Sequence, residues 1–254
     1  MQRALITAPA GDVGVLVGRR VAIEGDLLVA GHDRPVVFEN LAGTWTHVRT
    51  LPNTAPAGLM ATADDLLGVG ADRIAMGLPR DGLAGFSDSG TLVIANRHPT
   101  LGFEFGPRIA HPYGGTGSRF ARFFDLDGPI IGVSTYQDGD GSAWVFEDDG
   151  SGGFTFTELV TATGVQQGYG FSITVAGTRI TVGSKTPYFG FARLGAVHVF
   201  DRLAAGWSET YVLLPAAAER TPGVELGTFH ASDGATVMAR SVFGLHLFEV
   251  PPPP

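Results

Sequence analysis

The chain has 254 residues, of which 44% are hydrophobic and 17% charged, so it can bury a sizeable core and is not a disordered tail. The formal net charge of −8 disfavours nucleic acid and anionic membrane surfaces as partners, and no long apolar run predicts a membrane insertion. The absence of cysteine excludes disulfides, thiolate catalysis and Cys-ligated zinc. The 37 glycines and 16 prolines predict many tight turns and few long helices.

The two ends of the chain carry little information about location. The first residues lack the apolar core of a secretory signal, so we expect no signal peptide in this chain. Residues 251–254 are four prolines, which we expect to form either a frayed tail or a linker to further protein. The cellular location is therefore not assigned from the sequence.

Five hairpin-like segments recur along the chain, each with a short β-like run, a Gly or Asp turn, and a second β-like run. The residues that close these segments lie 46, 57, 49 and 56 positions apart: Gly31, Gly77, Ser134, Gly183 and Ala239. This spacing is typical of the blades of a β-propeller.

Two further β-like runs follow most of these hairpins. The third run usually ends in Phe, as at Phe38, Phe146 and Phe200, and the fourth opens with Gly and an aromatic residue, as at Gly206-Trp207. The fifth copy stops after its third run, whereas the chain begins with an unmatched run at residues 3–11. An N-terminal strand that paired with the last blade would remove an exposed edge.

The sequence therefore predicts an all-β fold, a five-bladed β-propeller with four-stranded antiparallel blades. The N-terminal strand is expected to close the ring as the outer strand of the last blade. We expect a single domain over residues 1–250, followed by a proline tail at 251–254. The expected blades lie at about 13–54, 58–112, 117–163, 168–216 and 223–250, the last completed by a strand at 2–10.

The repeat resembles the bacterial FG-GAP repeat, which is related to the blades of the integrin α-subunit propeller. Val21–Thr46 and Phe171–Trp207 carry the resemblance best. It implies a propeller and a secreted or cell-surface location, but little about function, because propellers host many activities. The calcium loops of integrin-type blades are not matched by the hairpin turns here, so no metal site is carried over.

No metal or catalytic motif emerges elsewhere. The stretch Asp138–Ser142 places oxygen ligands at alternate positions, but Ala143 and Asp149 stand where a calcium loop needs Gly and Glu, so we expect a solvated turn, with a weak calcium site as the alternative. His198 and His246 lie on neighbouring blades and are expected to be too far apart to share zinc. We therefore expect no cofactor, no metal and no catalytic residue.

The expected inner strands line the central channel of the propeller. Their middle positions are Ala22, Gly68, Asp125, Thr174 and His230. The three polar residues of this set are expected to form a hydrogen-bonded structural network, because buried polar groups need partners. The alternative is a polar site, and a glycan hydrolase or lyase could use such channel carboxylates.

Aromatic residues gather in the loops of one face, where the connections between second and third strands and between blades should meet. Loops on a rigid scaffold commonly carry binding, and Tyr suits stacking on sugars or anchoring a protein partner. Asp140, Lys185 and Arg193 could add hydrogen bonds. The predicted ligand-binding residues are Tyr113, Tyr136, Tyr169, Tyr188, Phe86, Phe189, Asp138 and Gln167. The alternative is that these side chains fold back and pack against their own loops.

These observations favour a non-catalytic recognition module that binds a protein partner or a carbohydrate ligand on the loop-rich face. Two rivals remain: the glycan hydrolase or lyase with channel carboxylates, and a structural or scaffold subunit of a larger fused or multi-subunit assembly.

Overall fold

A computed structural model describes residues 6–7, 20–31, 35–51, 66–70, 72–82, 86–100, 102–151, 153–160, 168–185, 188–189, 192–221 and 223–253 of the chain. Every element is a β-strand except one short 3-10 helix at Ala217–Glu219. Among these residues, no helix has the length and apolar character needed to cross a membrane.

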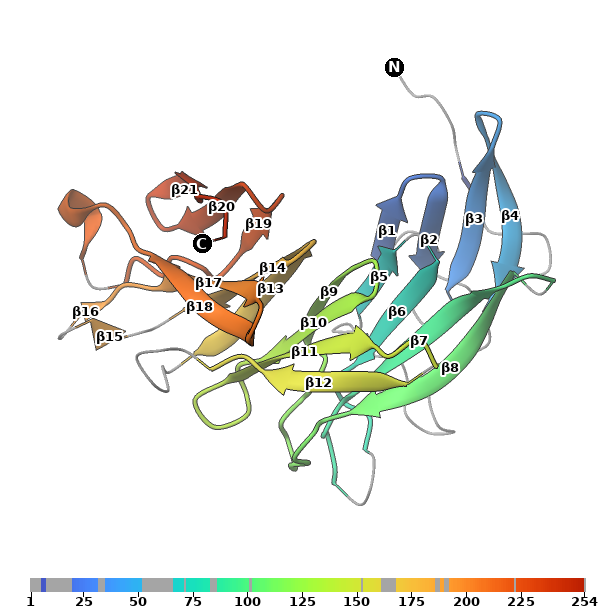
Figure 1. Cartoon of the computed structure of the whole chain (residues 1–254), viewed down its shortest axis with the longest axis horizontal. Coiled ribbons are helices and arrows are strands. Elements are labelled where there is room, and N and C mark those ends of the chain that lie inside the picture. The colour runs from blue at the N-terminus through green and yellow to red at the C-terminus, as the bar shows by residue number, and fades with distance from the viewer. Residues whose placement is uncertain are drawn as a thin grey trace.

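Five sheets follow one another along the chain, and we number them as blades 1 to 5 (Figure 1). Blade 1 contains β1 (Arg20–Glu24), β2 (Leu27–Gly31), β3 (Val36–Leu41) and β4 (Thr44–Thr50). Blade 2 contains β5 (Leu66–Gly70), β6 (Arg73–Leu78), β7 (Thr91–His98) and β8 (Gly102–Ala110). Blade 3 contains β9 (Phe123–Asp127), β10 (Ile130–Thr135), β11 (Ser142–Asp148) and β12 (Phe154–Glu158).

The last two blades differ slightly from this plan. Blade 4 contains β13 (Tyr169–Ala176), β14 (Arg179–Ser184), β17 (Ala196–Leu203) and β18 (Gly206–Leu213). A separate two-stranded sheet, β15 (Tyr188–Phe189) and β16 (Ala192–Arg193), lies in the connection between β14 and β17. Blade 5 contains β19 (His230–Ser232), β20 (Thr236–Ser241) and β21 (Gly244–Glu249). All strand pairs within the five blades are antiparallel, which confirms the predicted all-β class and four-stranded blades 1 to 4.

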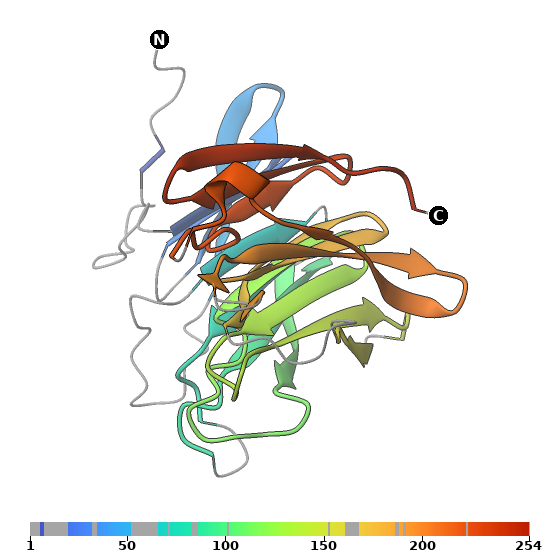
Figure 2. The same cartoon turned by 90° about the vertical axis from the view of Figure 1, so that its left-hand side faces the viewer.

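The blades are arranged as in a β-propeller. The first strands β1, β5, β9, β13 and β19 lie beside one another in this order along the inner side of the arc, while β4, β8, β12 and β18 lie at its outside (Figures 1 and 2). Each blade begins at the first residue of its inner strand. These first residues lie on the same face of the molecule as the loops between the second and third strands. We call this the loop face.

The hairpin turns have glycine at the predicted places. Gly25, Gly128 and Gly177 join the inner strand to the second strand with φ of 54°, 54° and 56°. This left-handed conformation is readily adopted by glycine, which explains why the turn glycine recurs in the sequence.

A buried apolar cluster fills each of the four junctions between successive blades. Blades 1 and 2 meet around Val29 and Ile74, and blades 2 and 3 around Leu92 and Trp144. Blades 3 and 4 meet around Val145 and Ile180, and blades 4 and 5 around Val199 and Val237. Each blade therefore buries both faces of its sheet except where the series begins and ends.

Blades 1 and 5 expose apolar side chains on the faces that have no neighbouring blade. Val21 and Ile23 on β1 are 56% and 60% exposed, and Leu245 and Leu247 on β21 are 68% and 72% exposed. No apolar cluster joins the described parts of blades 1 and 5. Blade 5 has three strands here, as predicted for its own chain segment. Of the predicted closing strand, only Ile6 and Thr7 are described, and they are not in a strand, so these residues do not show ring closure.

Glycines at the start of the third strand allow successive blades to approach closely on the loop face. A Cβ at Gly90, Gly141 or Gly195 would overlap a backbone carbonyl oxygen of the next blade's approach segment, that of Phe120, Tyr169 and Leu226 respectively. All three glycines also have positive φ, between 74° and 104°. Two independent demands, steric and conformational, therefore restrict these positions to glycine.

Gly141→Ala should destabilise the fold by about 2–4 kcal/mol, from backbone strain of about 1 kcal/mol and the overlap with the Tyr169 carbonyl. Gly139→Ala is the matched control, because Gly139 also has positive φ (57°) but nothing within 4 Å of its Cβ position. Urea unfolding of both variants measures the difference. Equal destabilisation would show that the close approach of the blades is not what restricts residue 141.

A buried ion pair fastens blade 5 to blade 4 at the opposite face. The Arg179 guanidinium donates to both carboxylate oxygens of Asp201, at 2.7 Å and 3.1 Å. It also donates to the carbonyl oxygens of Gly234 and Pro251. The five donors of arginine suit this role, since one group satisfies a carboxylate and two backbone segments at once. Pro251, the first residue of the predicted proline tail, is therefore held by a hydrogen bond.

Candidate functional site

The loop-face ends of the inner strands of blades 3 and 4 carry a cluster of aromatic and cationic side chains. Phe123 opens β9, Tyr136 follows β10, and Phe171 lies at the bulge of β13 between Tyr169 and Ser172. Arg122 directly precedes β9, and Lys185 directly follows β14. All five side chains are half-buried. We call these five residues the rim cluster.

The three rings of the rim cluster stack on one another. Tyr136 and Phe171, from neighbouring blades, have ring centroids 4.5 Å apart and an interplanar angle of 21°. Phe123 stacks on Phe171 at 5.7 Å and 29°, and lies 6.1 Å from Tyr136. Such pairs contribute about 0.5–1.5 kcal/mol each beyond the area that they bury. The arrangement fixes the loop after β10 to the start of blade 4.

Two cations lie over these rings. The Arg122 guanidinium is 5.0 Å from the centroid of Tyr136, and the Lys185 ammonium is 5.4 Å from the centroid of Phe171. Arg122 also donates to the Gln137 side-chain oxygen at 3.1 Å, and Lys185 lies 3.5 Å from a carboxylate oxygen of Glu225. Each ring of the Tyr136–Phe171 pair therefore already has the other ring and a cation as neighbours. The two cations and the edges of the rings are the parts that a ligand could contact.

Tyr113 lies on the same face but outside the rim cluster. Its hydroxyl donates to Glu158 at 2.9 Å, and its ring packs edge-on against Phe156, so it covers the outer strand of blade 3. The hydrogen bond to Glu158 raises the pKa of Tyr113, followed in effect by the charge of the same carboxylate. The ring is 65% exposed, which leaves it open to a partner at the periphery.

The expectation that Tyr169 presents its ring to a ligand is wrong. Tyr169 is 5% exposed, begins β13 rather than lying in a loop, and donates its hydroxyl to the Leu159 carbonyl at 2.9 Å. Burial raises the pKa of its phenol well above the usual value, and the charges of Glu209 and Glu158 add to the effect. Tyr169 is a core residue of the junction between blades 3 and 4.

Asp138 is used mainly within the protein. Its carboxylate accepts hydrogen bonds from buried His111 at 3.0 Å and from the Ser142 hydroxyl at 3.1 Å. Because His111 Nδ1 accepts the backbone N–H of Tyr113, its proton sits on Nε2 and points at Asp138. The stretch Asp138–Ser142 forms a turn closed by the Gly141 N–H and the Asp138 carbonyl, and the described residues contain no group of three metal-binding side chains.

The other predicted residues fall in two groups. Phe86 is 41% exposed and its ring lies against Gly114, in the connection between blades 2 and 3. Tyr188 and Phe189 form strand β15, but their side chains lie outside the described part of the structure, as does Gln167 altogether. Their predicted roles stay untested.

Sequence reasoning missed Arg122, Phe123 and Phe171. The prediction was based on aromatic residues in the long loops. Phe123 and Phe171 instead lie near the start of inner strands, and Arg122 directly precedes one. An inner strand end is as accessible as a loop in a propeller, because the loop face exposes both. The sequence does carry a partial signal, because aromatic residues stand at or beside the start of the inner strand in blades 3, 4 and 5, at Phe123, Phe171 and Phe229, although not in blades 1 and 2.

The channel residues form a hydrogen-bonded chain, as predicted for Thr174 and His230. The Ser172 hydroxyl donates to the Gly227 carbonyl at 2.8 Å, so it must accept from His230 Nδ1, 2.7 Å away. His230 Nε2 lies 2.9 Å from the Thr181 hydroxyl, which in turn contacts Thr174, and 3.2 Å from the Thr181 carbonyl oxygen. Burial lowers the pKa of His230 to about 4, although the hydrogen bond with the Thr181 backbone acts in the opposite direction.

Asp125 and Asp127 tie blade 3 to blade 4. Asp125 accepts the Val175 N–H at 2.8 Å, and Asp127 accepts the Gly177 N–H at 2.7 Å. Burial raises the pKa of Asp125 despite these backbone hydrogen bonds, which act in the opposite direction. Burial also raises the pKa of Glu24, to which the charges of Asp127 and Asp125 add. The carboxylates of the channel therefore already serve as acceptors for the neighbouring blade.

The fold should lose stability as the pH falls from about 6.5 to about 4, because unfolded His230 binds a proton in this range and folded His230 does not. The loss is on the order of 3 kcal/mol, at about 1.4 kcal/mol per pKa unit. His230→Gln should flatten this part of the profile, while His47→Gln, at an exposed position of β4, should not. Free energies of unfolding measured between pH 7 and pH 4 test this prediction. An unchanged slope in His230→Gln would contradict the assignment.

Two hollows lie at the face opposite the loop face. One, of about 390 Å³, is lined in part by Glu39 and Arg97, which form an ion pair. The other, of about 280 Å³, is lined in part by Arg179, which pairs with Asp201 of the same blade and donates to Gly234 and Pro251 of blade 5. Because Arg97 and Arg179 already hold neighbouring blades together, we assign these hollows to the packing of the blades rather than to a ligand.

Comparison with known proteins does not assign the chain to a family. No protein-family model matches it, and no curated protein matches it significantly, so the resemblance to the FG-GAP repeat has no support beyond the residues themselves. The β-propeller domain of the trilobed protease from Pyrococcus furiosus is similar over 92% of this chain and 69% of its own, with a TM-score of 0.48 and 10% identity.

Two other solved structures are similar at 10% identity. A hypothetical selenium-binding protein from Sulfolobus tokodaii has a TM-score of 0.46 over 74% of this chain, which spans about half (52%) of that protein. A GH43 endo-arabinanase from Bacillus licheniformis has a TM-score of 0.36 over 91% of this chain and 92% of its own. At these TM-scores the likenesses say nothing about activity. The propeller class rests on the five sheets themselves.

Proposed function

We propose that this protein is a non-catalytic recognition module whose ligand docks on the rim cluster. The observation that supports this is the stack of Tyr136 on Phe171 with Arg122 and Lys185 above the rings. Half-buried aromatic and arginine side chains on a rigid support are the residues that dominate binding energy in interfaces. Here two strand ends from different blades hold them, so little ordering entropy would be lost on binding.

A protein partner fits this geometry better than a neutral glycan. Recognition of sugars by stacking needs a free aromatic face, and the faces of Tyr136 and Phe171 already have one another and the two cations as neighbours. A protein surface can instead meet ring edges, a guanidinium and an ammonium together. The peripheral Tyr113 and Phe86 would extend the contact over blades 2 and 3.

A glycan hydrolase or lyase is less well supported. The raised pKa of Asp125 is the property expected of a general acid. However, its carboxylate accepts the Val175 N–H, and its neighbour Asp127 accepts the Gly177 N–H, so both act between blades. Binding therefore accounts for more of the loop face than hydrolysis does for the channel.

Tyr136→Ala and Phe171→Ala should each weaken binding at least tenfold, because either change removes one ring of the stack and the support of its cation. The ligand is to be identified by a glycan array run beside capture of proteins from the source cells. Leu41→Ala is the control, since this side chain is also exposed but ends β3 of blade 1, at the face opposite the loop face. If circular dichroism shows that all the variants are folded and both rim variants bind the ligand as tightly as the wild type, the site is refuted.

We further propose that the ring is closed in solution by the segment 2–10 beside β21. The support is that β21 has one neighbouring strand among the described residues and exposes Leu245 and Leu247. Because the chain lacks cysteine, an introduced pair is unambiguous. Ile6→Cys combined with cysteine at one of positions 245 to 248 should form a disulfide in the monomer. Absence of a crosslink for every pairing would argue against this closure.

A further inference from the structure

The position held by Arg240 breaks the pattern of the repeat. In each blade one residue near the loop-face end of the second strand pairs with the beginning of the inner strand and faces the next blade. Gly77, Ser134 and Gly183 hold this place in blades 2 to 4, and a Cβ at Gly77 or Gly183 would overlap the backbone of the following blade. Ala239, which the sequence spacing places here, pairs with His230 but packs against blade 4, so in blade 5 the side chain on the other face belongs to Arg240, whose N–H donates to the Phe229 carbonyl. Departures from an otherwise consistent pattern are expected at functional sites.

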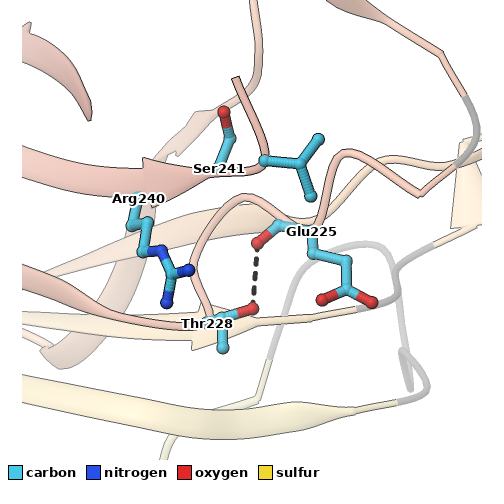
Figure 3. Close-up of a pocket in the computed structure, with 5 residues that line it drawn as sticks. Glu225, Thr228, Arg240 and Ser241 are labelled. Atoms are coloured by element: carbon cyan, nitrogen blue, oxygen red, sulfur yellow. Dashed lines mark hydrogen bonds between the residues drawn. The ribbon is translucent and has the colours of Figure 1, made fainter. Parts of the chain in front are cut away.

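Arg240 borders a small pocket on the loop face of blade 5. The pocket, of about 70 Å³, is lined by Glu225, Thr228, Arg240, Ser241 and Val242. Figure 3 shows the Arg240 guanidinium on one side of Thr228 and the Glu225 carboxylate on the other, with the Thr228 hydroxyl donating to the Glu225 carbonyl at 2.9 Å. Arg240 lies 5.8 Å from the centre of the exposed Phe229 ring, and it pairs with no carboxylate in the described structure.

Glu225 connects this pocket to the rim cluster. Its carboxylate lies 3.5 Å from the Lys185 ammonium, which itself lies over Phe171. Glu225 also has a φ of 54°, an uncommon conformation for a residue other than glycine, and strain of this kind concentrates at functional sites. The ion pair with Lys185 holds the only pocket-lining carboxylate away from Arg240, which leaves the guanidinium as the group that a ligand would meet.

We infer that this pocket is an anion subsite that takes a carboxylate side chain of an acidic protein partner, an inference that rests on the recognition proposed for the rim cluster. The pocket, of about 70 Å³, is small and is bordered by one guanidinium, which suits a single anionic group. The carboxylate of Glu225 repels a doubly charged phosphate more strongly than a singly charged carboxylate.

The surroundings of the pocket favour a protein as the source of that carboxylate. Val242, Phe243 and Phe229 are 63%, 57% and 55% exposed. Contiguous exposed apolar side chains around an arginine are typical of protein interfaces. The net charge of −8 opposes the long-range approach of an acidic partner, but at physiological salt charges beyond about 8 Å are largely screened, so the local charges decide the contact.

The test measures binding of a fluorescent hexaglutamate peptide to the full chain, with hexaglutamine as the uncharged probe. Wild type should prefer hexaglutamate, and Arg240→Gln should weaken its binding at least tenfold. Glu225→Gln should strengthen it several-fold, because the competing carboxylate is removed while the side-chain shape is kept. Arg202→Gln is the control, since it removes the same charge from an exposed arginine at the opposite face, and it should change affinity less than twofold.

The outcomes separate this inference from the proposed function. Equal binding of hexaglutamate by wild type and Arg240→Gln, or an equal loss in Arg202→Gln, overturns the subsite. If hexagalacturonate or inorganic phosphate is the only probe whose binding changes in Arg240→Gln, the proposal of an acidic protein partner is overturned. The recognition proposal is judged by different variants, because it fails only when Tyr136→Ala and Phe171→Ala leave binding of the identified ligand unchanged.

Discussion

The close approach of successive blades on the loop face is the constraint on which the structure depends. Gly90, Gly141 and Gly195 lie against the backbone of the chain as it enters the next blade. This contact sets how near two sheets can come and hence which apolar residues fill the junction between them. It also sets the positions of the first residues of each inner strand, and the rim cluster is built from those residues.

The fold could be predicted largely from the sequence because its signals are local and repeated. Short alternating runs, turn glycines such as Gly25 and Gly177, and the missing fourth strand of blade 5 all follow from the pattern within about 50 residues. What the pattern did not yield is contact between blades. The role of the glycines before the third strands depends on a carbonyl oxygen some 30 residues further along the chain, which no local pattern shows.

The candidate site could likewise be predicted only in part from the sequence. Tyr136 was predicted from its loop and belongs to the rim cluster, but Tyr169, also predicted in a loop, begins β13 and is buried. Strand alternation alone would put Tyr169 and Phe171 on the same side, but the bulge between Tyr169 and Ser172 changes this, so Tyr169 faces the core while Phe171 joins the rings at the surface. A bulge and its effect on direction cannot be inferred from one sequence without the register of the strands.

The unmatched faces of blades 1 and 5 have a consequence for assembly. They belong to opposite ends of one series of sheets, so a contact between the first face of one molecule and the last face of another would be heterologous. Such a contact leaves a free first face and a free last face at the two ends of every chain of molecules. Whatever covers Ile23 and Leu247 within one molecule therefore also prevents open-ended polymers.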